Sequence, residues 1–266
     1  MQRSSMRVAS RIAVSPSYLE CYAAQIGALG ACGQKHLRRS RVLIAGAGGV
    51  GSTVAMVLAM SGVGALIVVD PQRIETDNFN RGAFLRRRDI GRSKVDVLAA
   101  ALDGRPYLSV IPIVRRIESI KNAAVLDDVD LFIATANSVR ARVAVASFAV
   151  QRQVPQVSAA LTDARTAFGG LVVAWTPQRR DLACPACLLA PNAQLPRGES
   201  ILAAVAAAVG SIAAHCATRL LTLDRHGIQS PANIVSIDLG RHSMESLKIF
   251  RRTDCPACGE ENRTWR

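Results

Sequence analysis

A glycine-rich turn between two apolar runs is where residue types and spacing in this sequence most clearly suggest chemistry. Residues 41–45 (RVLIA) have the pattern of a buried strand, and the run from Gly46 to Gly51 follows at once. Glycines let a backbone approach phosphate closely, and the helix predicted over 52–60 would present unpaired N–H groups there. A second β-branched run ends at Asp70, whose carboxylate could accept hydrogen bonds from a ribose. The pattern predicts a nucleotide site.

Polar and basic residues after Asp70 favour a triphosphate over a dinucleotide. Asn78 and Arg81 form an Asn-x-x-Arg element, and Lys94 opens the next predicted helix. Each charge-assisted contact between these cations and a phosphate would contribute about 1.5–3 kcal/mol. An NAD-dependent oxidoreductase could use the same glycine turn and Asp70, so it stays as an alternative, although hydride transfer needs none of these three residues.

Two identical Cys-Pro-Ala-Cys tetrapeptides predict a metal site. The four candidate ligands are Cys184, Cys187, Cys255 and Cys258. Each pair has the spacing of a zinc knuckle, and four thiolates complete a tetrahedral site with no open position. We therefore expect structural Zn²⁺ that ties the C-terminal region to the rest of the chain. The alternative is two separate redox or buried pairs.

These elements, in this order and spacing, resemble the ThiF/MoeB/HesA adenylyltransferases, relatives of ubiquitin-activating enzymes, from about residue 22 to residue 259. The resemblance implies ATP-dependent adenylation of the C-terminal carboxylate of a small sulfur-carrier or ubiquitin-like protein or peptide. Pyrophosphate would leave, and the acyl-adenylate would await sulfur or amine transfer. It also implies Mg²⁺ with the ATP, a homodimer and, for sulfur transfer, a separate sulfur donor.

The same resemblance assigns roles residue by residue. Four glycines would form the ATP loop, one acid would hold the ribose, and an amide and two cations would contact the phosphates as the catalytic candidates. In that order, these residues are Gly46, Gly48, Gly49 and Gly51, then Asp70, then Asn78, Arg81 and Lys94.

Three departures from the family pattern bear on mechanism. Ala136 stands where the family has an aspartate that helps to hold magnesium, and Asp130 is the nearest acid upstream. Ala24 stands where an arginine of the N-terminal arm would reach the partner's ATP. Residues 192–200, where some members carry a thioester cysteine, contain none. The sequence therefore disfavours covalent thioester transfer, and a degenerate or partner-dependent ATP-binding subunit stays as an alternative.

The order of predicted elements indicates an α/β fold: a Rossmann-like, doubly wound, mostly parallel sheet with a C-terminal antiparallel extension. We expect a helical arm over 1–40 and one adenylation domain over 41–259. Its nucleotide-binding half would span about 41–157, and its carrier-binding and zinc half about 158–259. The further predicted strands are 109–114, 131–135, 154–157, 168–175, 234–239 and 245–250, and the further predicted helices are 93–102, 139–151 and 199–221.

Charge and composition indicate which partners and which cellular compartment the sequence favours. The net charge is +13, but aromatic residues make up only 4% of the chain, so a nucleic-acid partner is disfavoured. The cluster Arg86–Arg88 is a candidate for phosphate or partner contact. No signal peptide is predicted, and the apolar run 201–214 is too short to span a bilayer. Seven cysteines in a metal-type pattern favour a reducing compartment, and we expect a cytoplasmic protein without membrane contact.

Overall fold

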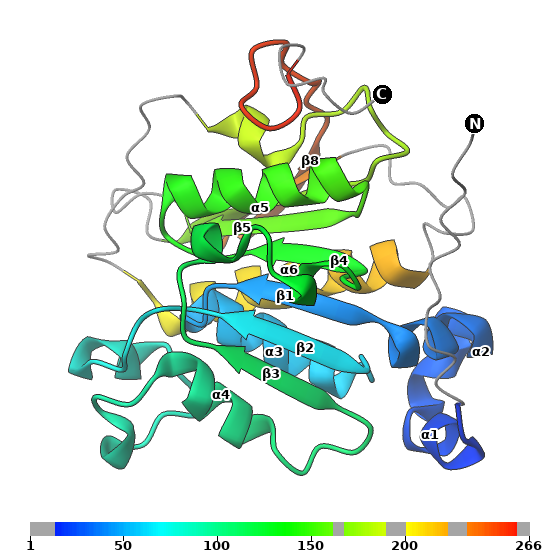
Figure 1. Ribbon diagram of the computed structural model, residues 1–266, viewed down its shortest axis with the longest axis vertical. Helices are drawn as coiled ribbons and strands as arrows, with labels where there is room; N and C mark the ends of the chain where they lie inside the picture. The colour runs from blue at the N-terminus through cyan, green and yellow to red at the C-terminus, as the bar shows by residue number, and fades with distance from the viewer. Residues whose placement is uncertain (1–13, 162–167, 190–200, 223–232, 260–266) are drawn as a thin grey trace.

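The structure is a computed structural model that describes residues 14–161, 168–189, 201–222 and 233–259. Its centre is one eight-stranded sheet with the strand order β3-β2-β1-β4-β5-β6-β7-β8 (Figure 1). The strands are β1 (Arg41–Ala45), β2 (Ala65–Val69), β3 (Ser109–Ile113), β4 (Leu131–Ala134), β5 (Gln156–Leu161), β6 (Gly169–Trp175), β7 (Ile234–Asp238) and β8 (Ser243–Leu247). The α-helices are α1 (Pro16–Cys21), α2 (Ala23–Arg39), α3 (Gly49–Met60), α4 (Lys94–Leu102), α5 (Val139–Arg152) and α6 (Ala203–Thr222).

The first five strands of this order run parallel. β1 lies in the middle and pairs with β2 on one side and β4 on the other, so that Val42 faces both Leu66 and Leu131. All five residues of β2 and all four of β4 are buried. Parallel strands covered on both faces need continuous apolar runs rather than alternation, which is why these segments could be recognised from sequence.

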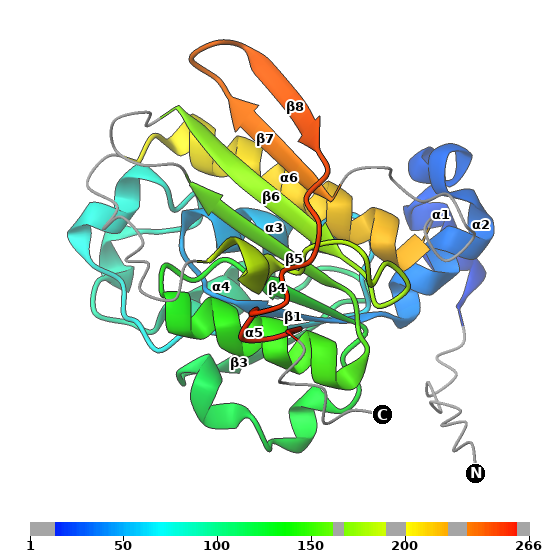
Figure 2. The same cartoon turned by 90° about the horizontal axis from the view of Figure 1, so that it is seen from above.

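Helices cover both faces of the sheet (Figure 2). One core cluster joins the sheet to α3 and α6, and Gly210 of α6 lies so close to α3 that a Cβ there would be 2.7 Å from the Thr53 Cβ. A second cluster, on the opposite face, joins the sheet to α5 and to the cysteine-containing segments. This two-sided cover makes the fold doubly wound, as predicted.

The C-terminal part of the sheet is antiparallel, which confirms the predicted extension. β5 pairs with β6, β6 with β7 and β7 with β8, all antiparallel. β8 ends at Leu247, three residues before the predicted end, because the chain leaves the sheet toward Cys255. α3 begins at Gly49, earlier than the predicted start at residue 52, because the glycine turn itself supplies the first helical turn.

Helix α6 has the length and apolar composition of a membrane-spanning helix, the one such helix in the described ranges. Half of its most apolar window (50%) is buried inside the protein, against α3, β5 and β6. The prediction of a buried helix agrees with this packing. The expectation that the apolar run 201–214 is too short to span a bilayer was wrong, since the helix that contains most of this run has 20 residues.

The helices α1 and α2 form an arm at the amino ends of β1 and β2. The Tyr18 hydroxyl donates a 2.7 Å hydrogen bond to the Gly62 carbonyl, just before β2, and burial raises the pKa of Tyr18 to about 12. Gln25 donates to the Ser61 carbonyl at 2.9 Å, which places the neighbouring Ala24 at this end of the sheet as well. The arm therefore lies away from the carboxyl ends of the strands of its own chain (Figure 1).

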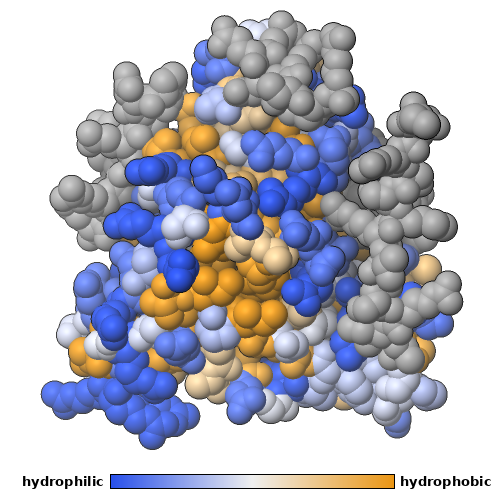
Figure 3. All heavy atoms as spheres, viewed as in Figure 1, coloured by the Kyte–Doolittle hydropathy of each residue, from blue (hydrophilic) through white to orange (hydrophobic). Residues whose placement is uncertain are grey.

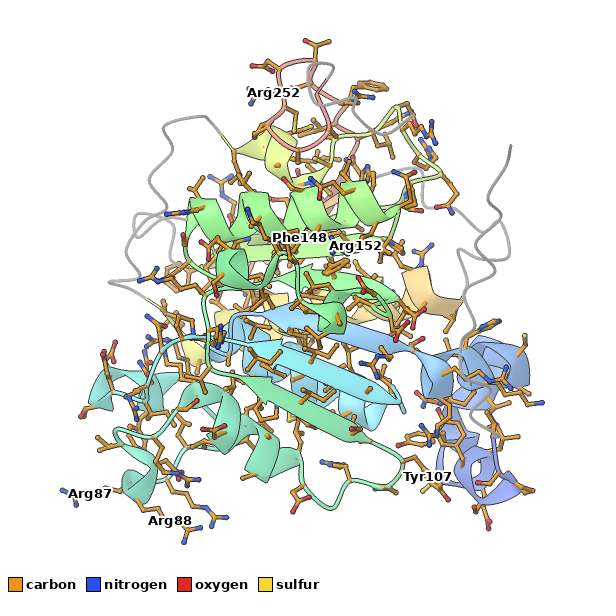
Figure 4. The ribbon with its side chains drawn as sticks, in the orientation of Figure 1. Arg87, Arg88, Tyr107, Phe148, Arg152 and Arg252 are labelled. Carbon is orange, nitrogen blue, oxygen red and sulfur yellow. The ribbon has the colours of Figure 1, made fainter. Side chains whose placement is uncertain are left out.

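Hydropathy varies across the face seen in Figure 3. Apolar residues gather toward the middle of this face, whereas hydrophilic residues dominate its lower left part, around the turn that carries Arg87 and Arg88 (Figures 3 and 4). The two arginines extend outward from the edge of the molecule.

Candidate active site

A cleft of about 450 Å³ lies at the carboxyl ends of the parallel strands. Its walls come from the ends of β1, β2, β4 and β5, and α6 closes one side. β1 connects toward β2 while β4 lies on its other side, so the cleft sits where the strand order reverses, the usual ligand position in open α/β sheets. The sequence-predicted residues that line it are Gly46, Gly48, Gly49, Asp70, Asn78, Arg81 and Lys94.

The glycine turn is packed tightly against the end of β4. Gly46 has a φ of 109°, and a Cβ there would lie 2.7 Å from the Ala136 backbone nitrogen. Gly51 does not line the cleft; a Cβ there would collide with the Gly46 carbonyl oxygen. Gly48, in contrast, is exposed and open toward the cleft. Gly46 and Gly51 thus allow the turn to pack tightly, whereas Gly48 leaves space for a ligand.

Replacing Gly51 by alanine is expected to lower the free energy of unfolding by about 1–3 kcal/mol, because the added methyl overpacks the turn against backbone that cannot move away. Gly48→Ala is the matched control: its φ is −76° and no atom lies within 4 Å of the new Cβ. We expect that control to change stability by less than about 1 kcal/mol. Urea unfolding of both variants measures the difference, and equal stabilities would contradict the packing assigned to Gly51.

Asp70 ends β2 and is 5% exposed. One carboxylate oxygen accepts a 2.7 Å hydrogen bond from the Ala47 N–H, and the other accepts from the Gln72 N–H at 2.8 Å. The carboxylate therefore holds the glycine turn to the end of β2. Each oxygen keeps a second lone pair, so the predicted contact with a ribose stays open to this residue.

Asn78 lies in a short 3-10 helix, Thr76–Asn80, and Arg81 is the C-cap residue of that helix. Asn78 is buried, accepts from the Glu75 N–H at 3.2 Å and donates to the Asp77 carboxylate at 2.7 Å, so it shapes the turn. Arg81 donates to the Asp77 carbonyl and to the Asn80 side chain, both at 2.6 Å. Its stem lies over the glycine turn, since a Cβ on Gly49 would be 3.0 Å from the Arg81 Cβ.

Lys94 begins α4 and reaches the same cleft. Its ammonium donates to the Gln72 side chain at 2.9 Å. Gln72 follows the end of β2 and was missed by the sequence reasoning, because a single glutamine in a connecting segment carries no periodic or motif signal. The bond holds the ammonium beside the Asp70 segment, where it can add positive charge to the cleft.

The acid that the sequence suggested as a replacement for the one missing at Ala136 does not lie near the cleft. Asp130 lies at the start of β4 and accepts from the Arg41 N–H at 2.9 Å, at the far end of the sheet, so it cannot replace the acid missing at Ala136. Ala136 lines the cleft, as does Glu118, which follows β3. Asp70, Glu75 and Asp77 also line the cleft and accept hydrogen bonds from neighbouring groups, whereas the Glu118 side chain makes no hydrogen bond or ion pair in the described part of the chain.

The cluster Arg86–Arg88 does not line the cleft. It lies beside a buried acid instead: the Asp89 carboxylate accepts from the Arg86 N–H at 2.9 Å and from the Arg92 side chain at 2.7 Å, which holds the pKa of Asp89 below its usual range. A direct contact between this cluster and phosphates in the cleft is therefore an incorrect expectation.

A further cation in the cleft, Arg142, was also missed. It lies on α5 and is 5% exposed. A signal for it exists in the sequence, because Arg142 shares one helical face with the apolar residues 145, 146 and 149 at the i, i+3, i+4, i+7 spacing. An arginine on such a face is either strongly paired or directed at a ligand.

The four predicted metal ligands come together on the α5 side of the sheet. All four thiols are buried, and their sulfur atoms lie within 4.8 Å of one another. Three of the sulfur–sulfur distances are 3.9, 3.6 and 3.5 Å. Four ligands at the zinc–sulfur bond length of about 2.3 Å in a tetrahedron would lie about 3.8 Å apart. The donor set and spacing thus fit zinc.

The four thiols share their protons through mutual hydrogen bonds. These bonds lower the pKa of Cys187 and Cys255 and raise the pKa of Cys184 and Cys258. Arg252 donates to the Cys187 carbonyl at 3.1 Å, forms a 2.7 Å ion pair with Asp254 and lies beside the C-terminal loop (Figure 4). Zinc here would bind the segment after β8 to the segment after β6.

Comparison with known proteins identifies the family. Residues 22–257 match the model of the ThiF family. Protein HesA, heterocyst, of Trichormus variabilis is 27% identical over 256 residues, covering 94% of this chain and 92% of the relative. The sulfur carrier protein ThiS adenylyltransferase of Escherichia coli is 29% identical over 237 residues, covering 86% and 90%.

The fold agrees with this assignment. The crystal structure of E. coli MccB with MccA superposes with a TM-score of 0.72 at 20% sequence identity, over 92% of this chain and 77% of that one. The family match spans most of the sequence, so the chain belongs to the ThiF family, and the predicted adenylyltransferase is confirmed.

Proposed function

We propose that this protein binds ATP in the cleft and adenylates the C-terminal carboxylate of a small carrier protein or peptide, releasing pyrophosphate. The observation that carries the proposal is the meeting of the glycine turn, Asp70, Arg81 and Lys94 in one cleft at the switch point of the sheet. Relatives named for ThiS, and a structural neighbour solved with MccA, support this class of acceptor.

In this mechanism, the residues position and neutralise rather than transfer protons. A terminal carboxylate is already ionised at neutral pH, so no general base is needed. The triphosphate would lie on the glycine turn and the N-terminus of α3, with its ribose at Asp70. Arg81 and Lys94 would withdraw charge from the phosphates while the carboxylate attacks the α-phosphorus in line, and Asn78 would keep the Arg81 turn in place.

Magnesium would bind mainly through the phosphates in this protein. Alanine at 136 removes the acid that the family places there, and Asp130 lies at the other end of β4. Glu118, which lines the cleft and makes no ion pair in the described residues, could add a carboxylate ligand, and its oxygen chemistry suits Mg²⁺. The ion would screen the triphosphate as the acceptor approaches.

The remaining assignments extend the proposal. Structural zinc would occupy the cluster of four cysteines, and the protein would act as a homodimer in the cytoplasm with a separate sulfur donor where sulfur is delivered. The domain limits given above, with one unit over 41–259, belong to the same proposal. A degenerate or partner-dependent ATP-binding subunit is the alternative, favoured by the alanines at 136 and 24.

Exchange of labelled pyrophosphate into ATP tests this function. We expect zinc-loaded protein to catalyse exchange that depends on a carrier or peptide with a free C-terminal carboxylate and stops when that terminus is amidated. If ATP binds but no acceptor from a panel of sulfur carriers and peptide tails supports exchange, the proposed activity is wrong and the subunit alternative replaces it.

Ligand-induced stabilisation separates adenylation from the oxidoreductase alternative. ATP with magnesium at about 100 times its Kd is expected to raise the free energy of unfolding by about 2.7 kcal/mol. NAD at the same concentration is expected to leave the melting temperature unchanged, because no step of the proposed chemistry uses it. Thermal unfolding with each nucleotide makes the comparison, and stabilisation by NAD alone would contradict the assignment.

A further inference from the structure

Arg142 is a buried cation on the wall of the cleft whose hydrogen-bond partners are all neutral. Its Nη1 donates to the Ser158 hydroxyl at 2.8 Å and to the Ala134 carbonyl at 3.5 Å. Its Nη2 donates to the Ala159 carbonyl at 2.8 Å. Its Nε is buried and has no partner. These contacts orient the guanidinium but leave its charge uncompensated.

Burying such a charge is unfavourable. A guanidinium removed from water normally has a carboxylate beside it, since neutral acceptors recover only part of the lost hydration. No acid of the described segments forms an ion pair with Arg142. Burial lowers the pKa of Arg142 to about 10, so the side chain still carries its charge at neutral pH. The wall of the cleft at Arg142 therefore suits an anion.

The position of Arg142 separates it from the residues proposed to bind ATP. Its three acceptors are Ala134, the last residue of β4, and Ser158 and Ala159 in the middle of β5, whereas Asp70 ends β2 and Lys94 bonds to Gln72 just after it. β5 is three strands from β2 in the sheet, or about 14 Å at the usual strand spacing. Near Arg142 the cleft is lined by Ala141, Ala160 and Leu161, and a further cation of the described residues, Arg116, lines the same cleft.

We propose that Arg142 binds the terminal carboxylate of the acceptor and positions it for attack on the α-phosphorus. This inference rests on the proposed function and adds a residue to it. A carboxylate oxygen forms the new bond to phosphorus, the bond between the α-phosphorus and the bridging oxygen breaks, and pyrophosphate leaves with the electron pair. Arg142 keeps its proton throughout.

Binding measurements with simple probes test this assignment. The probes are αβ-methylene ATP, acetyl-glycyl-glycine with a free carboxylate, and the same dipeptide as its amide. In the wild-type protein saturated with αβ-methylene ATP, we expect the acid to bind at least about tenfold more tightly than the amide, because the amide cannot form a charge-assisted bond. Calorimetry gives both affinities.

Variants at Arg142 distinguish ligand binding from a structural role. Arg142→Met is expected to abolish the preference for acid over amide while changing the affinity for αβ-methylene ATP by less than about twofold. Arg142→Lys keeps a charge without the planar fork and is expected to keep part of the preference. Arg140→Met, at an exposed position on the same helix, is the matched control and should behave like wild type.

Three results would overturn the assignment. The acid preference could survive in Arg142→Met, the Met variant could lose nucleotide affinity as much as acid affinity, or the wild-type protein could fail to distinguish acid from amide. Failure of the proposed function is a separate result, since the wild-type protein would then either not bind αβ-methylene ATP or bind ATP without supporting carboxylate-dependent pyrophosphate exchange. If Arg142→Met does not fold, the ratio of acid to amide affinity in Arg142→Lys decides the question.

Discussion

Replacing Arg81 by alanine is expected to lower carboxylate-dependent pyrophosphate exchange about 10²–10³-fold. The reason is that a positioned charged donor facing developing phosphate charge contributes about 2.7–4 kcal/mol to the transition state. The Arg81 side chain is close to the glycine turn, and its hydrogen bonds go to Asp77 and Asn80 within its own turn. Its removal should therefore leave the core and the free energy of unfolding nearly unchanged.

The control for this variant is Arg87→Ala. Arg87 is exposed and extends away from the molecule, outside the cleft, so its loss removes the same charge from the protein without touching the site (Figure 4). We expect near wild-type exchange from it. Steady-state exchange rates at saturating ATP, together with the melting temperatures of both variants, complete the measurement. Wild-type exchange in Arg81→Ala would show that the proposed phosphate role belongs to another residue.

Loss of zinc is the second large effect. Zinc binding in small four-ligand peptides contributes about 10–16 kcal/mol, and here the ion would join two segments 67 residues apart in the chain. Cys255→Ser removes one of four buried sulfurs. We expect this variant to lose most of its zinc and to unfold at a much lower temperature, because three thiols would remain buried without their metal.

Cys32→Ser provides the matched control, since Cys32 is exposed on α2 and far from the cluster. Its zinc content and melting temperature should equal those of the wild type. Zinc per chain is measured by elemental analysis, and stability by thermal unfolding with and without a chelator. A double variant of Cys255 and Cys258 that still held one zinc per chain would contradict the four-thiolate site.

Much of the nucleotide-binding architecture could be predicted from local sequence. β1, β2 and β4 are uninterrupted apolar runs because both faces of the parallel sheet are covered, and the glycine turn follows directly from the first of them. Element ends were less predictable. β8 stops at Leu247 because the chain turns toward the cysteine cluster, and two members of that cluster, Cys184 and Cys187, are distant from residue 247 in the sequence.

Whether an individual charged side chain lies in the cleft or outside it depended on tertiary packing. The sequence singles out Arg86–Arg88 because the arginines are consecutive, yet they lie outside the cleft, where the Arg86 N–H bonds to Asp89. It does not single out Arg142, which the apolar face of α5 carries into the cleft wall. A charge run describes composition along the chain, whereas the surroundings of a charge depend on which strands lie under its helix.

By itself, the sequence determined the family, the parallel core, the glycine turn and the two cysteine pairs. Those features are encoded by periodicity and by short motifs, which are local properties of the chain. Only the tertiary structure decided that Asp70 holds the glycine turn, that Asp130 lies at the far end of β4, and that Arg142 meets β5 without a counter-charge. Each of these depends on strand order, which brings together residues that are distant in the chain.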